Sequence, residues 1–383
     1  MSTKISHPSI DAEHVTVGTD CAIDPDSLIC GDHVAIGRGV VIGQGVRISA
    51  DRIEIADGCR IGRHASIVSP EIRIGTKSAI GADCTIELNA HLRIGKLADV
   101  GRRLRAVGQG IEAGDHLWVT DDVTIGGGGR GQRSFLTLGH RCAIMDRSFI
   151  NIAEPVEIGD ETALSNNTIV LTHAMWQPIL DGGTAQFGPV RIGRQVIVYV
   201  NAVIAPGITI GDHVTIGAGA LVVRDVPSGS MAVGNPARIV KSTPSFPRSL
   251  TAERRDALVR ELLREYADGL AAKGARVSRP SADTLAVALN DSEDLIRYIA
   301  PGATGAANER PAISVAVGAV PDAAKGRVHL DLEARTMNGE PTPLAEDLRD
   351  FLRRRSIRVF TDQPFRSLAL ANTARLKARL LDR

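Results

Sequence analysis

Aliphatic residues recur at intervals of six positions along most of the first 222 residues. A step of six matches neither the 3.6-residue period of a helix nor the two-residue alternation of a flat strand. It matches a coil of three short strands joined by tight corners, with about eighteen residues per turn and one inward aliphatic residue per strand. The series comprises Ile36, Ile42, Ile48, Ile55, Ile61, Ile67, Ile74, Ile80, Ile86, Leu138, Ile144, Ile150, Ile158, Leu164, Val170, Ile192, Val198, Ile204, Ile210, Ile216 and Val222.

The six-residue pattern predicts a mainly β chain whose residues 1–241 form a parallel β-helix domain. The step is lost over residues 103–137 and again over 172–189, so loops are expected to leave the coil at both places. Residues 242–249, "STPSFPRS", have the composition of a linker. Residues 250–383 follow as an accessory domain of the α/β or α+β class.

The accessory domain mixes helical and strand patterns. Helices are expected at 251–268, 291–299, 343–353 and 369–381, because apolar residues there recur at helical spacing. The segments "TLAVAL", "AISVAV", "VHLDLE" and "IRVF" alternate or run apolar over short lengths, which is typical of strands. No role for this domain follows from its sequence.

Composition narrows the functional classes. The 45 Lys and Arg residues nearly balance the 44 Asp and Glu residues, so no overall charge favours nucleic acid or an acidic membrane surface. The N-terminus lacks an apolar core of signal-peptide length, and no apolar run is long enough to span a membrane. We therefore expect a soluble cytoplasmic protein. Four of the five cysteines share a Cys-x-Ile pattern without any Cys-x-x-Cys pair, which predicts reduced, structural residues.

Residues 190–241, "VRIGRQVIVYVNAVIAPGITIGDHVTIGAGALVVRDVPSGSMAVGNPARIVK", resemble the ending of hexapeptide-repeat acyltransferases. The resemblance is to the galactoside, maltose and polysaccharide sugar O-acetyltransferases in particular. It implies a left-handed parallel β-helix that transfers an acyl group, normally acetyl, from coenzyme A to a sugar or sugar-like hydroxyl. It also implies a homotrimer with its active sites between neighbouring subunits and with no metal.

His173 is the candidate general base. It lies where the coil opens into the loop of residues 172–189, whereas four other histidines share one coil slot and are expected at corners: His14, His33, His116 and His213. Acyl transfer from a thioester needs a base that is substantially neutral near pH 7, and histidine meets that requirement. The resemblance places the family's catalytic base at His173 as well.

The resemblance also implies the residues that hold the acyl donor. Val200 falls at the position whose backbone N–H stabilises the oxyanion, although the preceding Tyr199 replaces a glycine and narrows the space for the acyl group. Gly217, Ala218 and Gly219 offer an exposed backbone along which the pantetheine arm of coenzyme A can lie. Arg224 and Arg238 match positions where the family often carries a cation for the nucleotide end.

The acceptor side is less well defined. The Asn and Asp residues that galactoside and maltose enzymes use for their sugar fall near Met145 and Ala153 in this sequence, so they do not carry over. Asp146 and Asn151 are close enough to substitute for them. Trp176, in the same loop as His173, is expected to pack across the mouth of the site.

Other functions remain open at this point. One alternative is an N-acetyltransferase of an amino sugar or nucleotide sugar, in which the acceptor is an amine instead of a hydroxyl. A non-catalytic β-helix scaffold or binding protein is a further alternative. A zinc enzyme of the γ-carbonic anhydrase type requires a His-x-x-x-x-His pair, and no two histidines of this chain are five positions apart.

Overall fold

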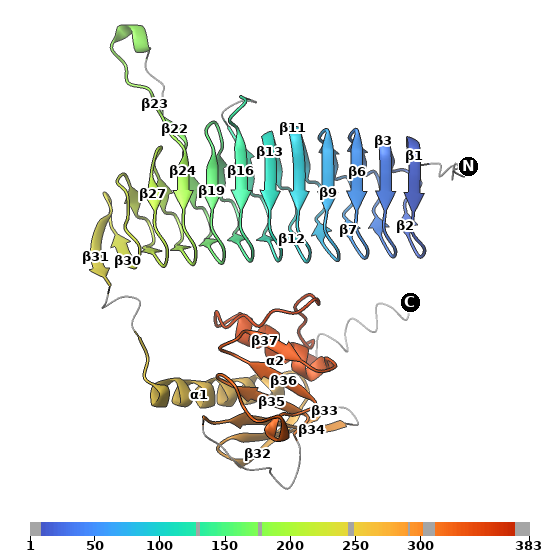
Figure 1. Ribbon diagram of the computed structural model, residues 1–383, viewed down its shortest axis with the longest axis vertical. Helices are drawn as coiled ribbons and strands as arrows, with labels where there is room; N and C mark the ends of the chain where they lie inside the picture. Colours follow the sequence, from blue (N-terminus) through green and yellow to red (C-terminus); the bar gives the residue numbers. More distant parts are fainter. Residues whose placement is uncertain are drawn as a thin grey trace. The chain divides into compact units, whose positions relative to one another are not determined.

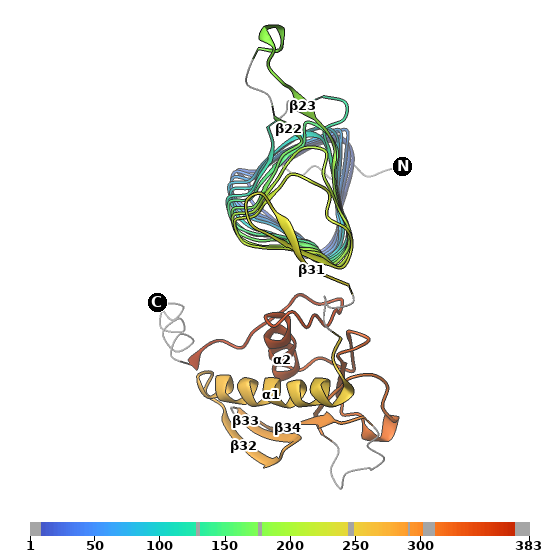
Figure 2. The ribbon, with the colours of Figure 1, turned by 90° about the vertical axis from the view of Figure 1, so that its left-hand side faces the viewer.

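The computed structural model describes residues 9–127, 131–174, 178–243, 249–289, 292–301 and 311–371. The chain divides into two compact units, Met1–Arg248 and Ser249–Arg383. The first unit is a β-helix of stacked parallel strands (Figure 1), and its coil has a triangular outline when seen end on (Figure 2). The expected mainly β fold of stacked coils, followed by a separate C-terminal domain, is confirmed.

Two sheets of the described residues make up the three faces of the coil. Two faces merge into a 17-stranded sheet, because the four long strands β1 (Ile10–Val17), β3 (Leu28–Ile36), β11 (Thr85–Ile94) and β13 (Arg105–Ala113) run around the corner between them. Its other strands are β5 (Arg47–Ser49), β6 (Arg52–Ile55), β8 (Ser66–Val68), β9 (Glu71–Ile74), β15 (Thr124–Gly126), β16 (Phe135–Leu138), β18 (Phe149–Asn151), β19 (Val156–Ile158), β21 (Ile169–Val170), β24 (Val190–Ile192), β26 (Val203–Ile204), β27 (Thr209–Ile210) and β29 (Leu221–Val222).

The third face is a 12-stranded sheet of mostly two-residue strands. Its last two strands pair antiparallel and end the coil. The strands are β2 (Ala22–Ile23), β4 (Val41–Ile42), β7 (Arg60–Ile61), β10 (Ala79–Ile80), β12 (Asp99–Val100), β14 (Trp118–Val119), β17 (Ala143–Ile144), β20 (Ala163–Leu164), β25 (Ile197–Val198), β28 (Thr215–Ile216), β30 (Ser230–Val233) and β31 (Arg238–Ser242).

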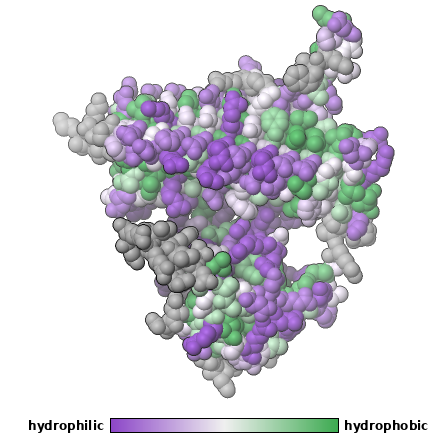
Figure 3. Space-filling model, turned by 180° about the vertical axis from the view of Figure 1, so that it is seen from behind, coloured by the Kyte–Doolittle hydropathy of each residue, from purple (hydrophilic) through white to green (hydrophobic). Residues whose placement is uncertain are grey.

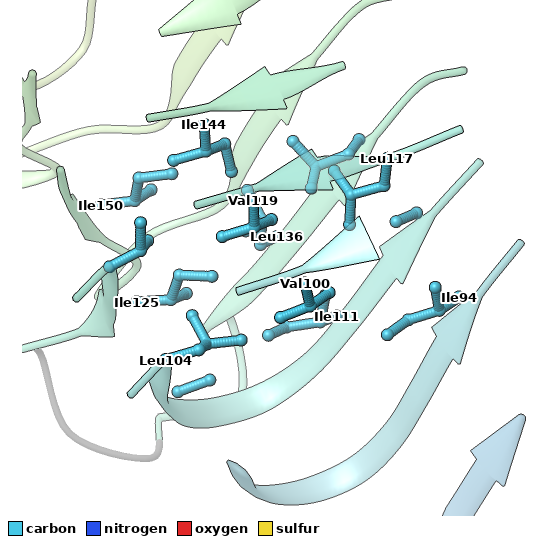
Figure 4. Close-up of a cluster of buried hydrophobic side chains, with 14 of the residues drawn as sticks. Ile94, Val100, Leu104, Ile111, Leu117, Val119, Ile125, Leu136, Ile144 and Ile150 are labelled. Carbon is cyan, nitrogen blue, oxygen red and sulfur yellow. The ribbon is translucent and has the colours of Figure 1, made fainter. Parts of the chain in front are cut away.

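The six-residue series forms the core of the coil. Each of its residues is buried and at most 4% exposed. Their side chains fill one continuous interior, where aliphatic groups from successive strands stack on one another (Figure 4). Burial of these aliphatic side chains drives the stacking. Each contributes roughly 1.5–3 kcal/mol of favourable free energy by leaving water.

Residues 103–137 differ from the loop that the sequence predicts. They contribute β13, β14, β15 and β16, and the coil continues through them. The six-residue step is present but disguised, because alanines occupy two of its inward positions: Val100 is followed by Ala106, Ala113, Val119 and Ile125, all buried. Inward side chains of this region, including Ile111 and Leu117, stack like those elsewhere in the coil (Figure 4).

Two groups of residues that were expected to be structural can be checked. The cysteines are free thiols, and Cys59, Cys84 and Cys142 are buried in the coil. His116 and His213 do lie at corners, with left-handed φ angles of 59° and 57°. The other two histidines of that group lie on strands instead, where the rings of His14 and His33 stack with centroids 4.6 Å apart.

The C-terminal unit is of the α+β class. Two helices, α1 (Ala252–Ala271) and α2 (Pro343–Arg353), share a hydrophobic core with a mixed six-stranded sheet. Its strands are β32 (Arg276–Ser281), β33 (Thr284–Leu289), β34 (Ser292–Ile299), β35 (Ile313–Ala316), β36 (Val328–Asp331) and β37 (Thr336–Asn338). No helix in the described ranges is both long and apolar enough to cross a membrane.

One helix prediction in this unit is wrong, and another cannot be compared. Residues 291–299 were expected to be helical, but β34 occupies 292–299 and pairs with β33 and β35. The side chains of Ile296 and Tyr298, two positions apart, are both buried in the core. This two-residue alternation is typical of a strand. The helix expected at 369–381 lies almost entirely outside the described residues.

Candidate active site

The coil opens at the end of β21, where the chain leaves the prism as a hairpin (Figure 1). In this hairpin, β22 (His173–Ala174) pairs antiparallel with β23 (Gln186–Phe187), and His173 is directly opposite Phe187. The N–H of Gly188 donates to the carbonyl of Thr172 at 3.0 Å and closes the base of the hairpin. A short 3₁₀ helix, η1 (Ile179–Asp181), lies beyond the two strands, and its Leu180 is 99% exposed.

His173 is held at the base of this hairpin by two neighbours. Its ring stacks on the ring of Phe187, with centroids 5.6 Å apart and an interplanar angle of 18°. Its Nδ1 lies 3.1 Å from Oδ1 of Asn151, which belongs to the preceding turn of the coil. The ring is half-buried, so it remains accessible from outside the coil.

Asn151 is itself enclosed, because it is only 2% exposed. Besides contacting His173, its Oδ1 accepts the hydroxyl proton of Thr172 at 2.5 Å and the backbone N–H of Ala153 at 3.1 Å. A backbone N–H can only donate, so the side-chain atom that faces it must be the amide oxygen. This contact therefore fixes the orientation of the Asn151 amide.

The orientation of Asn151 in turn determines the tautomer of His173. An amide oxygen accepts hydrogen bonds and cannot donate them, so Nδ1 of His173 must carry the proton that it shares with Asn151. In the neutral ring, Nε2 is then the unprotonated nitrogen with a free electron pair. A histidine of this form can take a proton from a substrate at Nε2.

A glycine shapes the space beside Asn151. Gly127 has a left-handed φ of 85°, and a Cβ atom there would lie 2.7 Å from Cζ of Phe149 and 3.0 Å from Nδ2 of Asn151. Both distances are shorter than a side chain tolerates, so only glycine fits without moving these two residues. Gly127 therefore serves the packing of Asn151 and Phe149.

Two corners of the coil carry the predicted site residues. We name the corner that contains Asn151 and His173 the His173 edge, and the corner that contains Asp146, Asn166, Val200 and Ala218 the Val200 edge. The two edges lie at opposite ends of the face that β18, β21, β26 and β29 share.

The structure separates the two residues expected on the acceptor side. Asp146 lies on the Val200 edge, where its carboxylate accepts the N–H of Asp121 at 3.0 Å and Nδ2 of Asn166 at 3.1 Å. It therefore links successive corners of the coil. Asn151, at the other end of β18, is buried beneath His173 and does not line an open surface. Trp176, the third expected acceptor residue, lies outside the described residues.

Of the residues expected to bind coenzyme A, Val200, Gly217, Ala218 and Gly219 lie together on the Val200 edge. Arg224 does not, because it follows β29 at the opposite end of the face. The N–H of Gly219 donates to the carbonyl of Val200 at 2.9 Å, so the two corners stack directly. Gly219 has a left-handed φ of 65° with open space where a Cβ would lie, which leaves its backbone accessible. Within the described ranges, the N–H groups of Val200 and Ala218 have no hydrogen-bond partner in the chain.

The remaining predicted residues are exposed. Tyr199, which precedes Val200 on the same corner, is 49% exposed. Arg224 follows β29, and Arg238 begins β31; both side chains are exposed. Across the described ranges, no group of three His, Cys, Asp or Glu side chains is arranged to hold a metal ion.

Part of the coil matches a known family model. The model of the bacterial transferase hexapeptide, a unit of six repeats, matches residues 189–224, which run from β24 through the Val200 edge. The resemblance to hexapeptide-repeat acyltransferases that residues 190–241 display is thereby confirmed.

Individual relatives agree with this class. The chain is 36% identical to YvoF of Bacillus subtilis (strain 168) over 98 residues, which is 26% of this chain and 54% of YvoF. It is 36% identical to the galactoside O-acetyltransferase of Escherichia coli (strain K12) over 88 residues, which is 22% of this chain and 43% of that enzyme. The chain thus spans about half the length of these curated relatives.

Among solved structures, the chain is similar to a maltose O-acetyltransferase from Clostridium difficile 630. It is 29% identical to this chain and aligns over 36% of this chain and 68% of its own, with a TM-score of 0.25.

Proposed function

We propose that this protein is an acyltransferase that moves an acetyl group from acetyl-CoA to a hydroxyl of a sugar or sugar-like acceptor. The observation that carries the proposal is the arrangement at His173. The ring is held by Asn151 and Phe187, Nδ1 is committed to Asn151, and Nε2 is left as a base at the opening of the coil. The similarity of part of the chain to a galactoside O-acetyltransferase supports the same chemistry.

In the proposed reaction, Nε2 of His173 removes the proton of the acceptor hydroxyl as its oxygen attacks the thioester carbon. The tetrahedral intermediate then collapses, the carbon–sulfur bond breaks, and the leaving thiolate takes the proton back from the imidazolium. The products are the acetyl ester and free coenzyme A. The N–H of Val200, which has no partner within the described chain, is the proposed donor to the oxyanion.

The proposed donor site lies along the Val200 edge. The corner at Gly217, Ala218 and Gly219 supplies exposed backbone for the pantetheine arm. Arg224 and Arg238 are exposed cations near the end of the coil and would meet the phosphates of the nucleotide. Tyr199 narrows the space beside Val200, which favours acetyl over longer acyl groups.

The two halves of this site require a second copy of the chain. His173 and Val200 are on different edges of one prism, separated by the face that contains β26. We therefore infer a homotrimer in which the His173 edge of one subunit meets the Val200 edge of its neighbour. Closed cyclic symmetry would complete three such sites at once.

The face between the two edges has the character of an interface. Phe149, Ile169, Val203 and Leu221 are register neighbours on successive strands, point outward and are half-buried. In the space-filling view, hydrophobic side chains gather on the coil near the base of the hairpin, while a hydrophilic band runs along the coil beside them (Figure 3). Contiguous apolar surface of this kind marks protein contacts.

The test is release of free thiol from acetyl-CoA in the presence of a panel of sugars and amino sugars. The His173→Ala variant should lose about 10²- to 10⁴-fold in turnover, the usual contribution of a general base. His213→Asn is the matched control, because His213 lies on another corner and asparagine tolerates its left-handed φ of 57°. Full turnover in His173→Ala would remove this residue from the mechanism.

The same panel distinguishes the alternatives. Turnover only with amino sugars would identify an N-acetyltransferase, which needs the same base for an amine acceptor. Acetyl-CoA binding without turnover on any acceptor would favour a non-catalytic role for the coil.

A further inference from the structure

We propose that Asn151 is a positioning residue that holds the base His173 in its neutral, Nδ1-protonated form and keeps it neutral to a lower pH than an acidic partner would. This inference rests on the proposed function. It goes beyond the proposed function by giving a role to Asn151, a buried side chain that contacts His173.

The amide oxygen of Asn151 is saturated with hydrogen bonds. Oδ1 of Asn151 accepts from Ala153, Thr172 and His173 at 3.1, 2.5 and 3.1 Å. The Thr172 hydroxyl is oriented in turn, because its oxygen accepts the N–H of Glu154 at 3.1 Å and so directs its proton to Asn151. Because the donors from Ala153 and Thr172 fix this oxygen independently of His173, the histidine meets an acceptor that is already in place.

The stacking of the coil brings Asn151 and His173 into contact. Asn151 ends β18, and His173 follows β21, the strand that pairs with β18 on the next turn. The register of the coil therefore sets their contact, although they are 22 positions apart. Phe187 covers one face of the ring while Asn151 holds its edge, so both the tilt and the rotation of the imidazole are restricted.

The side chain of Asn151 carries no charge. A carboxylate in the place of Asn151 would stabilise the imidazolium and raise the pKa of His173, by about 1 to 3 units for an opposite charge within hydrogen-bond distance. An amide orients the ring without that effect because it is neutral. A base must be unprotonated to act, so an amide partner extends activity toward acid pH. The nearest acidic residue in this network, Glu154, takes part through its backbone N–H, while its carboxylate pairs with Arg133 at 2.8 Å.

The activity test uses the nearly isosteric substitution Asn151→Asp. We expect the acid limb of the kcat/KM profile to move to higher pH by about 1 to 3 units, while the rate well above the new pKa stays close to that of the unchanged protein. Asn151→Ala should instead lower kcat by about 10- to 10²-fold at every pH with little change in KM, a smaller loss than removal of the base itself.

Asn89→Asp is the matched control. Asn89 is exposed on β11, which is linked to β18 through β13 and β15, so it lies three turns of the coil from Asn151. It adds the same charge to the coil away from both His173 and the Val200 edge, so the acid limb of its kcat/KM profile should not move. An unmoved acid limb in Asn151→Asp, or an equal shift in the control, overturns the proposal.

A second measurement does not depend on turnover. In the full-length protein with ¹⁵N-labelled histidine, the ring nitrogens of His173 should report a proton on Nδ1 at neutral pH, with the signals assigned by their loss in His173→Ala. The Nδ1-bound proton should be lost or shared with Nε2 in Asn151→Ala. A proton on Nε2 in the unchanged protein overturns the proposal. If the NMR result holds while His173→Ala keeps full turnover, the contact stands and the proposed function fails.

Discussion

One face of the coil changes character halfway along its length. From β5 to β15 one column of its outward residues is polar: Arg47, Ser66, Thr85, Arg105 and Thr124. From β18 to β29 the same column of register neighbours is apolar: Phe149, Ile169, Val203 and Leu221. The inward residues do not change, because aliphatic side chains fill the interior in both halves.

The comparison separates what makes the fold from what makes the site. Inward aliphatic residues specify the coil in both halves, so stability is spread along its length. Only the second half combines an apolar outward face, an interrupted corner with His173 and an open backbone on the Val200 edge. The proposed function therefore depends on outward residues and on the places where the repeat is broken.

The largest effect is expected when the outward column of the second half is made polar like that of the first. Val203→Asp places a charge in the centre of the apolar column, which should prevent assembly because an unpaired charge at an interface is costly to desolvate. Since the proposed site needs two subunits, turnover should fall to background. Light scattering coupled to gel filtration measures the mass of the particle. Thr85→Asp, on the same face in the polar half, is the control and should leave both mass and turnover unchanged.

Substitutions in the core test whether buried side chains stabilise the two halves of the coil equally. Ile67→Ala and Ile204→Ala each delete a fully buried side chain, one in each half. Both should lower the free energy of unfolding of the coil by about 2–5 kcal/mol, as cavity-forming substitutions do. Both tryptophans, Trp118 and Trp176, belong to the first unit, so their fluorescence during urea denaturation follows the coil. A cost confined to one half would show that the halves are stabilised differently.

The sequence predicted the coil well because its signal is repeated many times. It failed over 103–137, where Ala106 and Ala113 fill inward positions with too little apolar bulk to stand out. It predicted that His173 lies where the coil opens, because a break in a regular pattern is itself a signal; the role of His173 as a base stays a prediction. It did not predict the contact between Asn151 and His173, because that contact depends on how one turn stacks on the next. Nothing in the local sequence distinguishes such an asparagine from one at a corner.

The smallest expected effect on stability concerns ion pairs on the outside of the first half of the coil. There Glu71, on β9, pairs with Arg73 and Arg93. Glu71 lies 2.7 Å from Nε of Arg73 and 3.0 Å from Nε of Arg93. The hydrogen bond from Arg93 lowers the pKa of the Glu71 carboxyl below its usual value. Glu71→Gln should cost no more than about 1 kcal/mol at neutral pH, because partly exposed ion pairs are screened by water.

The stability that Glu71 contributes should depend on pH. A carboxyl with a lowered pKa in the folded state contributes stability above its unfolded pKa of about 4.3, and loses it as the pH falls through the folded pKa. The difference in unfolding free energy between the unchanged protein and Glu71→Gln should therefore be constant near neutrality and shrink below about pH 4.3. Urea titrations at several pH values measure it. A cost as large as that of Ile67→Ala would mean that outward ion pairs stabilise the first half of the coil as strongly as its core does.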